Sequence, residues 1–193
     1  MDILSILNSL QDKQAVNQLT KSVGADANQV KKAVELGLPM LMQAMGNNAK
    51  TPQGAASLAK ALDQHKEDPL DDVMGFLKGV DIDDGKKILG HIFNQKTQTV
   101  EKNLAAQTGM SSHQVENILA QLAPVLLGAL GKEKNQKNID ANGLTSMIPM
   151  LTGLLGSGSN KDVLGMAAKL LDADGDGDIM DDVSKMIGGF FKK

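Results

Sequence analysis

Residues 19–46 read LTKSVGADANQVKKAVELGLPMLMQAMG, and residues 104–131 read LAAQTGMSSHQVENILAQLAPVLLGALG. The two stretches align without a gap at a constant offset of 85 residues. Self-similarity at a fixed spacing is the signature of an internal repeat, so the chain is predicted to contain two copies of one unit, residues 1–97 and residues 98–193. The identical pairs are Leu19/Leu104, Gly24/Gly109, Gln29/Gln114, Val30/Val115, Pro39/Pro124, Leu41/Leu126, Ala44/Ala129 and Gly46/Gly131.

The match continues beyond this stretch, with insertions in the second copy. Residues 72–75 correspond to residues 162–165 at an offset of 90, and residues 84–93 correspond to residues 182–191 at an offset of 98. The second copy is therefore longer than the first between these two matches. The added residues include an Asp-rich stretch, residues 172–182, that the first copy lacks.

Within each copy the spacing of apolar residues is helical. Apolar positions recur at intervals of three and four residues, and the first such run ends at Gly24, where a left-handed glycine would terminate the helix. Asp26 or Asn28 is expected to cap the next helix, as Ser111 or Ser112 is in the second copy. No strand pattern competes with this periodicity.

The helices that follow these caps are apolar on nearly every side, and each contains one proline. Residues 38–45 and 123–130 are predicted to be buried central segments, because a helix without a polar face belongs inside a protein. Pro39 and Pro124 each remove a backbone donor, so each is predicted to kink or break its helix. The indicated fold class is all-α, a tandem and pseudo-symmetric helical repeat.

This order of helix, glycine turn and proline-containing apolar helix, together with DGKKILGHIF at residues 84–93, resembles the YidB-like bacterial family, the domain of unknown function 937. The resemblance extends over nearly the whole chain. It implies all-helical, homeodomain-like units. Because the biochemical role of that family is not established, the resemblance implies a fold and not a function.

Composition excludes several classes of function. The chain has no Cys, which excludes disulfides, thiolate metal sites and Cys nucleophiles. It has no Trp or Tyr for aromatic cages, and no Arg to form bidentate contacts with phosphate or guanine. The formal net charge is -3. Residues 172–182 hold six Asp and no Lys, so the acidity belongs to one stretch.

This acidic stretch, DADGDGDIMDD at residues 172–182, is the strongest candidate for a functional site. Asp at positions 1, 3 and 5 with Gly at position 6 is the pattern of EF-hand and dockerin-like loops, which the stretch resembles and which surround Ca²⁺ with oxygen ligands. Mg²⁺ also takes oxygen ligands and is the alternative ion. The predicted metal ligands are Asp172, Asp174, Asp176, Asp178 and Asp182.

The loop departs from the EF-hand pattern where the ligand shell should close. Position 12 is Val183 in place of a bidentate Glu, and Asp182 comes one residue early. Either the following helix begins sooner and Asp182 closes the site, or the affinity is weak and water completes the shell. A solvated acidic turn without metal is the other interpretation, but alternating carboxylates repel one another unless a cation lies between them. A structural role for the ion is favoured over a sensory one.

A nucleic-acid interface is the alternative function. Residues 104–118, and more loosely residues 19–34, have the spacing of a helix-turn-helix, and Lys31 and Lys32 would contact phosphate. The lack of Arg argues against this alternative. So does the apolar continuation of the helix through Pro124, which would bury it.

The histidines and methionines are predicted to have structural roles. His65, His91 and His113 lie in unrelated segments, so surface or capping roles are preferred to catalysis and the chain is predicted not to be an enzyme. The Met-rich residues 40–45 and 147–150 are predicted to fill the core rather than to form an adaptable groove for a partner.

The expected location is cytoplasmic, because residues 1–10 lack the basic start and cleavage signal of a secretory peptide. The apolar residues 143–156 are too few and too polar to span a bilayer. The leading prediction is a non-enzymatic helical binding or scaffold protein that carries a single Ca²⁺ loop and binds an unidentified protein partner.

Overall fold

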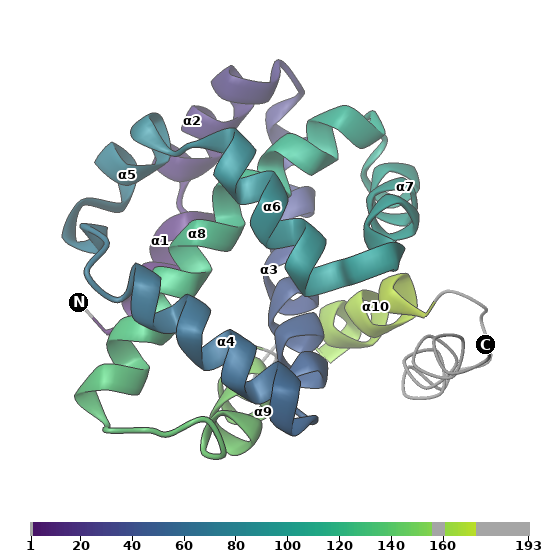
Figure 1. The fold of residues 1–193 in the computed structure, drawn as a ribbon. Coiled ribbons are helices and arrows are strands. Elements are labelled where there is room, and N and C mark those ends of the chain that lie inside the picture. Colours follow the sequence, from purple (N-terminus) through teal and green to yellow (C-terminus); the bar gives the residue numbers. More distant parts are fainter. Residues whose placement is uncertain (1, 156–160, 173–193) are drawn as a thin grey trace.

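The computed structural model describes residues 2–155 and 161–172, and every regular element in those ranges is a helix (Figure 1). The all-α class is therefore confirmed. Two short 3₁₀ helices, η1 (Leu70–Asp72) and η2 (Asn94–Lys96), precede α5 and α7. The α-helices are α1 (Ile3–Gln11), α2 (Lys13–Val23), α3 (Ala27–Asn48), α4 (Pro52–His65), α5 (Val73–Gly79), α6 (Ile82–Phe93), α7 (Thr97–Thr108), α8 (Ser112–Gln136), α9 (Leu144–Leu155) and α10 (Lys161–Leu171).

Helices α3 and α8 form the centre of the molecule, with the other helices arranged around them (Figure 1). Residues 36–42 of α3 are all buried, and so are residues 118–131 of α8. A helix can bury every residue over such a run only when other elements cover it on all sides. The two predicted central helices are thus confirmed.

The prolines do not interrupt these helices. Helix α3 continues from Ala27 to Asn48 through Pro39, and α8 continues from Ser112 to Gln136 through Pro124. Of the predicted kink or break, the break is therefore wrong for both helices, and the kink stays a prediction. A proline inside a helix costs about 3 kcal/mol, and complete burial of the surrounding apolar turns offsets a loss of that size.

The turns before the central helices follow the sequence closely. Gly24 and Gly109 adopt left-handed backbone angles, with φ of +64° and +72°, and end α2 and α7. Asp26 then caps α3, and Ser111 caps α8. In each cap the side-chain oxygen accepts a hydrogen bond from the backbone N–H three residues further on, at 3.4 Å in α3 and 3.2 Å in α8.

The two caps also contact each other's turns. Gln29 completes the capping box of α3, and its Nε2 donates to the carbonyl oxygen of Gly109 at 2.8 Å. Gln114 completes the box of α8, and its Nε2 donates to the carbonyl oxygen of Gly24 at 3.2 Å. Each glutamine therefore stabilises its own helix start and ties it to the turn of the other half.

Replacing either glutamine should weaken the whole fold. We expect Gln29→Ala and Gln114→Ala each to lower the free energy of unfolding by about 1–2 kcal/mol, because each removes a capping contact and the hydrogen bonding of its Nε2 to the other half. Urea unfolding followed by far-ultraviolet circular dichroism measures this loss. Gln98→Ala on the exposed surface of α7 is the matched control and should stay within about 0.5 kcal/mol of the wild type. Equal stability of all three variants would contradict the role of the caps.

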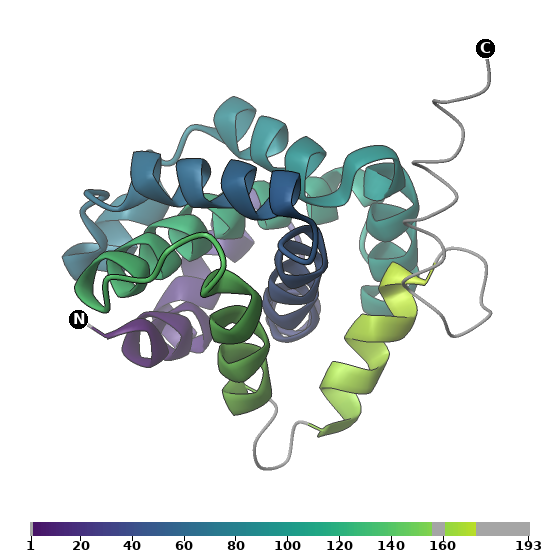
Figure 2. The ribbon, with the colours of Figure 1, turned by 60° about the horizontal axis from the view of Figure 1, so that its bottom comes forward.

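Each half of the chain packs its later helices on the central helix of the other half. Helices α4 and α6 pack on α8, whereas α9 and α10 pack on α3 and lie on either side of it (Figure 2). One hydrophobic cluster includes buried residues from all ten described α-helices. The predicted boundary between residues 97 and 98 falls at the start of α7, and helices on both sides of it share this core.

Two glycines set how closely α4 and α6 approach α8. A Cβ atom at Gly85 of α6 would lie 2.0 Å from the carbonyl oxygen of Ala120, and a Cβ atom at Gly131 of α8 would lie 2.4 Å from the carbonyl oxygen of Leu62. Both contacts are with backbone atoms, which cannot move aside as a flexible side chain can. The lack of a side chain at these two positions therefore fixes both helices against α8.

The methionines of the two predicted Met-rich stretches are buried, except for Met150. Met40, Met42, Met45 and Met147 are buried as predicted. Met150 on α9 is 68% exposed. Among the described helices, none combines the length and the apolar character needed to cross a membrane.

Candidate functional site

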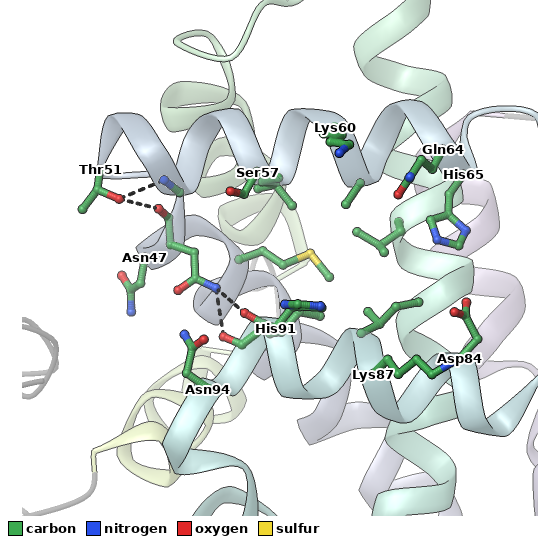
Figure 3. A pocket seen from close by; sticks show the side chains of 18 of the residues that line it. Asn47, Thr51, Ser57, Lys60, Gln64, His65, Asp84, Lys87, His91 and Asn94 are labelled. Atoms are coloured by element: carbon green, nitrogen blue, oxygen red, sulfur yellow. Dashed lines mark hydrogen bonds between the residues drawn. The ribbon is translucent and has the colours of Figure 1, made fainter. Parts of the chain in front are cut away.

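A groove of about 970 Å³ lies between α4 and α6, which run antiparallel across its width (Figure 3). We call it the α4–α6 groove. Its apolar lining comes from Met45, Leu58, Ile88, Ile92 and Leu127, so α3 and α8 contribute to it as well as the two walls. The polar residues that line it are Asn47, Asn48, Thr51, Ser57, Lys60, Gln64, His65, Asp84, Lys87, His91, Asn94 and Gln95.

One end of the groove is held together by side-chain hydrogen bonds. Asn48 Nδ2, at the end of α3, donates to the carbonyl oxygen of Ile92 at 2.9 Å and satisfies one of the free carbonyls in the last turn of α6 (Figure 3). Thr51 caps α4 by accepting a hydrogen bond from the backbone N–H of Gly54 at 3.1 Å, and its Oγ1 donates to the carbonyl oxygen of Asn48 at 3.4 Å. The end of α6 and the start of α4 are thus both tied to the end of α3.

The opposite end of the groove holds its acidic side chain. Asp84 of α6 and His65 of α4 both lie at this end (Figure 3). His65 Nδ1 is 2.9 Å from Asp68 Oδ2, which orients the imidazole ring. Asp84 is the one carboxylate among the described residues that line the groove.

Lys60 of α4 and Lys87 of α6 line the groove from its two walls, and Lys87 lies toward the end that holds Asp84 (Figure 3). Neither forms an ion pair with another residue in the ranges that the structure describes. Lys134 on α8 behaves differently, because its Nζ lies 2.7 Å from Asp63 Oδ1. That hydrogen bond holds the pKa of Asp63 below its ordinary value. The charge of Asp63 on α4 is therefore compensated by α8, whereas Lys60 and Lys87 in the groove have no ion-pair partner among the described residues.

This groove was not predicted from the sequence, although part of its signal is present there. Ser57, Lys60 and Gln64 are spaced by three and four residues, and so are Asp84, Lys87 and His91. Such spacing places each set on one helix face. A polar face is the usual solvent-facing side of a helix, so only the packing of α4 and α6 on α8 shows that the two faces line one groove.

The predicted metal loop lies almost wholly outside the described residues. Asp172 follows α10, and its backbone N–H donates to the carbonyl oxygen of Ala168 at 3.2 Å. Asp174, Asp176, Asp178 and Asp182 belong to residues 173–193, which the structure does not describe. Within residues 2–155 and 161–172, no three His, Asp or Glu side chains gather where they could hold a metal ion.

The lysines of the nucleic-acid alternative are engaged in contacts within the protein. Lys31 Nζ lies 3.7 Å from Glu35 Oε1, and Lys32 Nζ donates to the carbonyl oxygen of Gln107 at 2.6 Å. The start of α3 is thus joined to the end of α7. Nucleic-acid binding stays a prediction from the sequence.

A second ionic cluster joins α6, α7 and α8. Glu116 Oε2 lies 3.4 Å from Lys86 Nζ and 3.3 Å from His113 Nδ1. Burial raises the pKa of Glu101 on α7, the negative charge of Glu116 raises it further, and Lys86 opposes both effects. The protonated form of Glu101 is therefore more favoured in the folded state than in the unfolded chain.

The raised pKa of Glu101 predicts that the contribution of this group to the free energy of unfolding depends on pH. A carboxyl group whose pKa is raised by folding contributes its stability at low pH and loses it as the pH rises through the folded pKa. Compared with the wild type, Glu101→Gln should therefore gain free energy of unfolding as the pH rises from 4 to 7. Urea unfolding at both pH values measures the difference, with the exposed Glu67→Gln as control. A difference that is the same at both pH values would contradict the assignment.

The fold and the site define a class: an all-helical protein built on two buried, proline-containing helices, with an open groove lined by polar side chains. The model of a family of bacterial proteins of unknown function (DUF937) matches residues 5–133, and the chain belongs to this family. The match runs from α1 into the last turns of α8, so it includes both walls of the groove. No curated protein and no solved structure matches the chain.

Proposed function

We propose that this protein is a non-enzymatic binding protein and that the α4–α6 groove is its binding site. The proposal rests on one observation: most polar side chains that line the groove have no partner within the described part of the protein. Within the described ranges, nine polar side chains of the lining make no hydrogen bond or ion pair with the rest of the protein: Asn47, Ser57, Lys60, Gln64, Asp84, Lys87, His91, Asn94 and Gln95. Polar groups held on rigid helices around an apolar floor are the composition of a binding site.

The positions of the reactive side chains favour binding over catalysis. Ser57 and His65 are eight residues apart on α4, a separation of about 12 Å along the helix axis. A nucleophile and its base must lie within hydrogen-bond reach of each other, about 3 Å. The contact of His65 with Asp68 thus orients a ring that has no nucleophile beside it on its own helix.

Filling the groove tests the proposal. A displayed library of 12-residue peptides would be selected against the wild-type protein, and the recovered peptides measured on the Ser57→Trp variant. A large ring on the α4 wall should occupy the groove, so we expect these peptides to bind the variant about tenfold more weakly. Gln98→Trp on α7, at an exposed position outside the groove, should leave their affinity unchanged. Peptides that bind both variants as tightly as the wild type would place the binding site elsewhere.

We also propose that the two halves of the chain are copies of one homeodomain-like helical unit. The matched caps, the left-handed glycines and the reciprocal bonds of Gln29 and Gln114 support this proposal. So does the exchange of packing, in which each half covers the central helix of the other. In this view the pseudo-symmetric pair forms one folding unit.

The Ca²⁺ loop completes the proposal. Its support is the alternation of carboxylates in the sequence at Asp172, Asp174, Asp176 and Asp178, with Asp182 nearby, and Mg²⁺ is the competing ion. Asp172 lies directly after α10, which packs on α3 and α7. An ion bound there would stabilise the segment that follows the core.

A further inference from the structure

The α4–α6 groove presents cations that nothing in the described chain neutralises. Lys60 projects from the α4 wall and Lys87 from the α6 wall, and Asp84 at one end is the carboxylate facing them along the described lining (Figure 3). His65 and His91 add two groups that become cationic on protonation. The described lining of the groove therefore holds two lysines and one carboxylate, in a protein whose formal net charge is -3.

The floor of the groove is apolar and nearly buried. Leu58 and Ile88 line the groove beside Lys60 and Lys87, at 8% and 9% exposure, and Met45 and Leu127 lie deeper. Helix α6 has twelve residues, so the wall that it forms along the groove is about 18 Å long. Three turns of a partner helix have about this length, and a groove between two helices receives a third helix through its apolar face.

We propose, on the basis of the function proposed above, that the occupant of the α4–α6 groove is an acidic amphipathic helix of a partner protein. Its apolar residues, spaced by three and four, pack against Leu58 and Ile88. Its carboxylates lie between Lys60 and Lys87. The charge of Asp84 repels acidic residues from the His65 end, which sets the direction of the helix in the groove.

The composition of selected peptides is the first test. Peptides recovered from the library of 12-residue peptides on the wild-type protein should be enriched in Asp and Glu next to apolar residues at helical spacing. Their affinity should fall as the salt concentration rises, because both partners of the ion pairs are exposed. Recovered peptides without acidic residues, or with salt-independent affinity, would overturn the proposal.

Charge reversal is the second test. We expect Lys60→Glu with Lys87→Glu to weaken binding of the acidic peptides about tenfold and to abolish most of its salt dependence. The control is Lys13→Glu with Lys102→Glu, which makes the same change in net charge at exposed positions on α2 and α7. Equal weakening by both pairs would show a general charge effect and overturn the proposal.

The two proposals fail in different ways. If Ser57→Trp abolishes binding but charge reversal does not, the groove is the binding site and its occupant is not acidic. If Ser57→Trp has no effect, the function proposed for the groove fails as well. A peptide corresponding to residues 172–191 of this chain, which is acidic and then apolar, is included as a probe. Its binding to the groove in place of the library peptides would overturn the assignment to a partner protein.

Discussion

Replacing Gly85 with valine should lower the free energy of unfolding by about 3 kcal/mol, the upper end of the usual cost of overpacking a core. The first atom of any side chain at this position would lie 2.0 Å from the carbonyl oxygen of Ala120. That oxygen belongs to the backbone of a fully buried turn of α8, so α6 would have to move away. Ile88 and Ile92, which pack on the core from α6, would move with it.

The same helix offers a matched control. A Cβ atom at Gly90 meets nothing within 4 Å, and Gly90 is exposed. Gly90→Ala should therefore stabilise the protein by about 0.5–1 kcal/mol through helix propensity. Urea unfolding followed by circular dichroism gives both values. The two variants should change the free energy of unfolding in opposite directions. A Gly85→Val variant as stable as the wild type would contradict the packing of α6 on α8.

Calcium should produce the second large effect. A ligand at about one hundred times its dissociation constant adds about 2.7 kcal/mol to the stability of the state that binds it. If residues 172–182 bind Ca²⁺, the thermal midpoint should rise when Ca²⁺ replaces a chelator, and rise less with Mg²⁺. Circular dichroism is the appropriate signal, because the chain has no Trp or Tyr for fluorescence.

Substitution of the ligands separates this effect from general screening of charge. Asp172→Ala with Asp176→Ala should abolish the calcium response. Asp12→Ala with Glu67→Ala removes two acidic groups at exposed positions outside the loop and should leave the response intact. A calcium response of equal size in both double variants would show that the loop is not the site.

Local features of the fold were predictable because single residues encode them. A glycine that must adopt a positive φ, as Gly24 and Gly109 do, has few substitutes. A residue whose side chain accepts a hydrogen bond at a helix start, as Asp26 does, can be recognised from the residues next to it in the sequence. The buried helices were predictable as well, since a run of apolar residues has few other places in a folded protein.

The effect of the prolines and the existence of the groove were not predictable in the same way. Whether Pro39 ends a helix depends on the packing of the turns around it, which the local sequence does not contain. The groove depends on α4 and α6 packing on α8, a helix of the other half of the chain. Ser57 and Lys87 lie far apart in the sequence. The polar face of α4 that holds Ser57 and the polar face of α6 that holds Lys87 each have the pattern of an ordinary exposed helix face.

Amide chemical-shift mapping would show whether ligands bind between α4 and α6. The ¹⁵N-labelled full-length protein would be titrated with the tightest peptide recovered from the library. We expect the largest shift changes on residues 57–65 of α4 and 84–92 of α6. Changes confined to α9 and α10, where Met150 and Met166 are exposed, would contradict it.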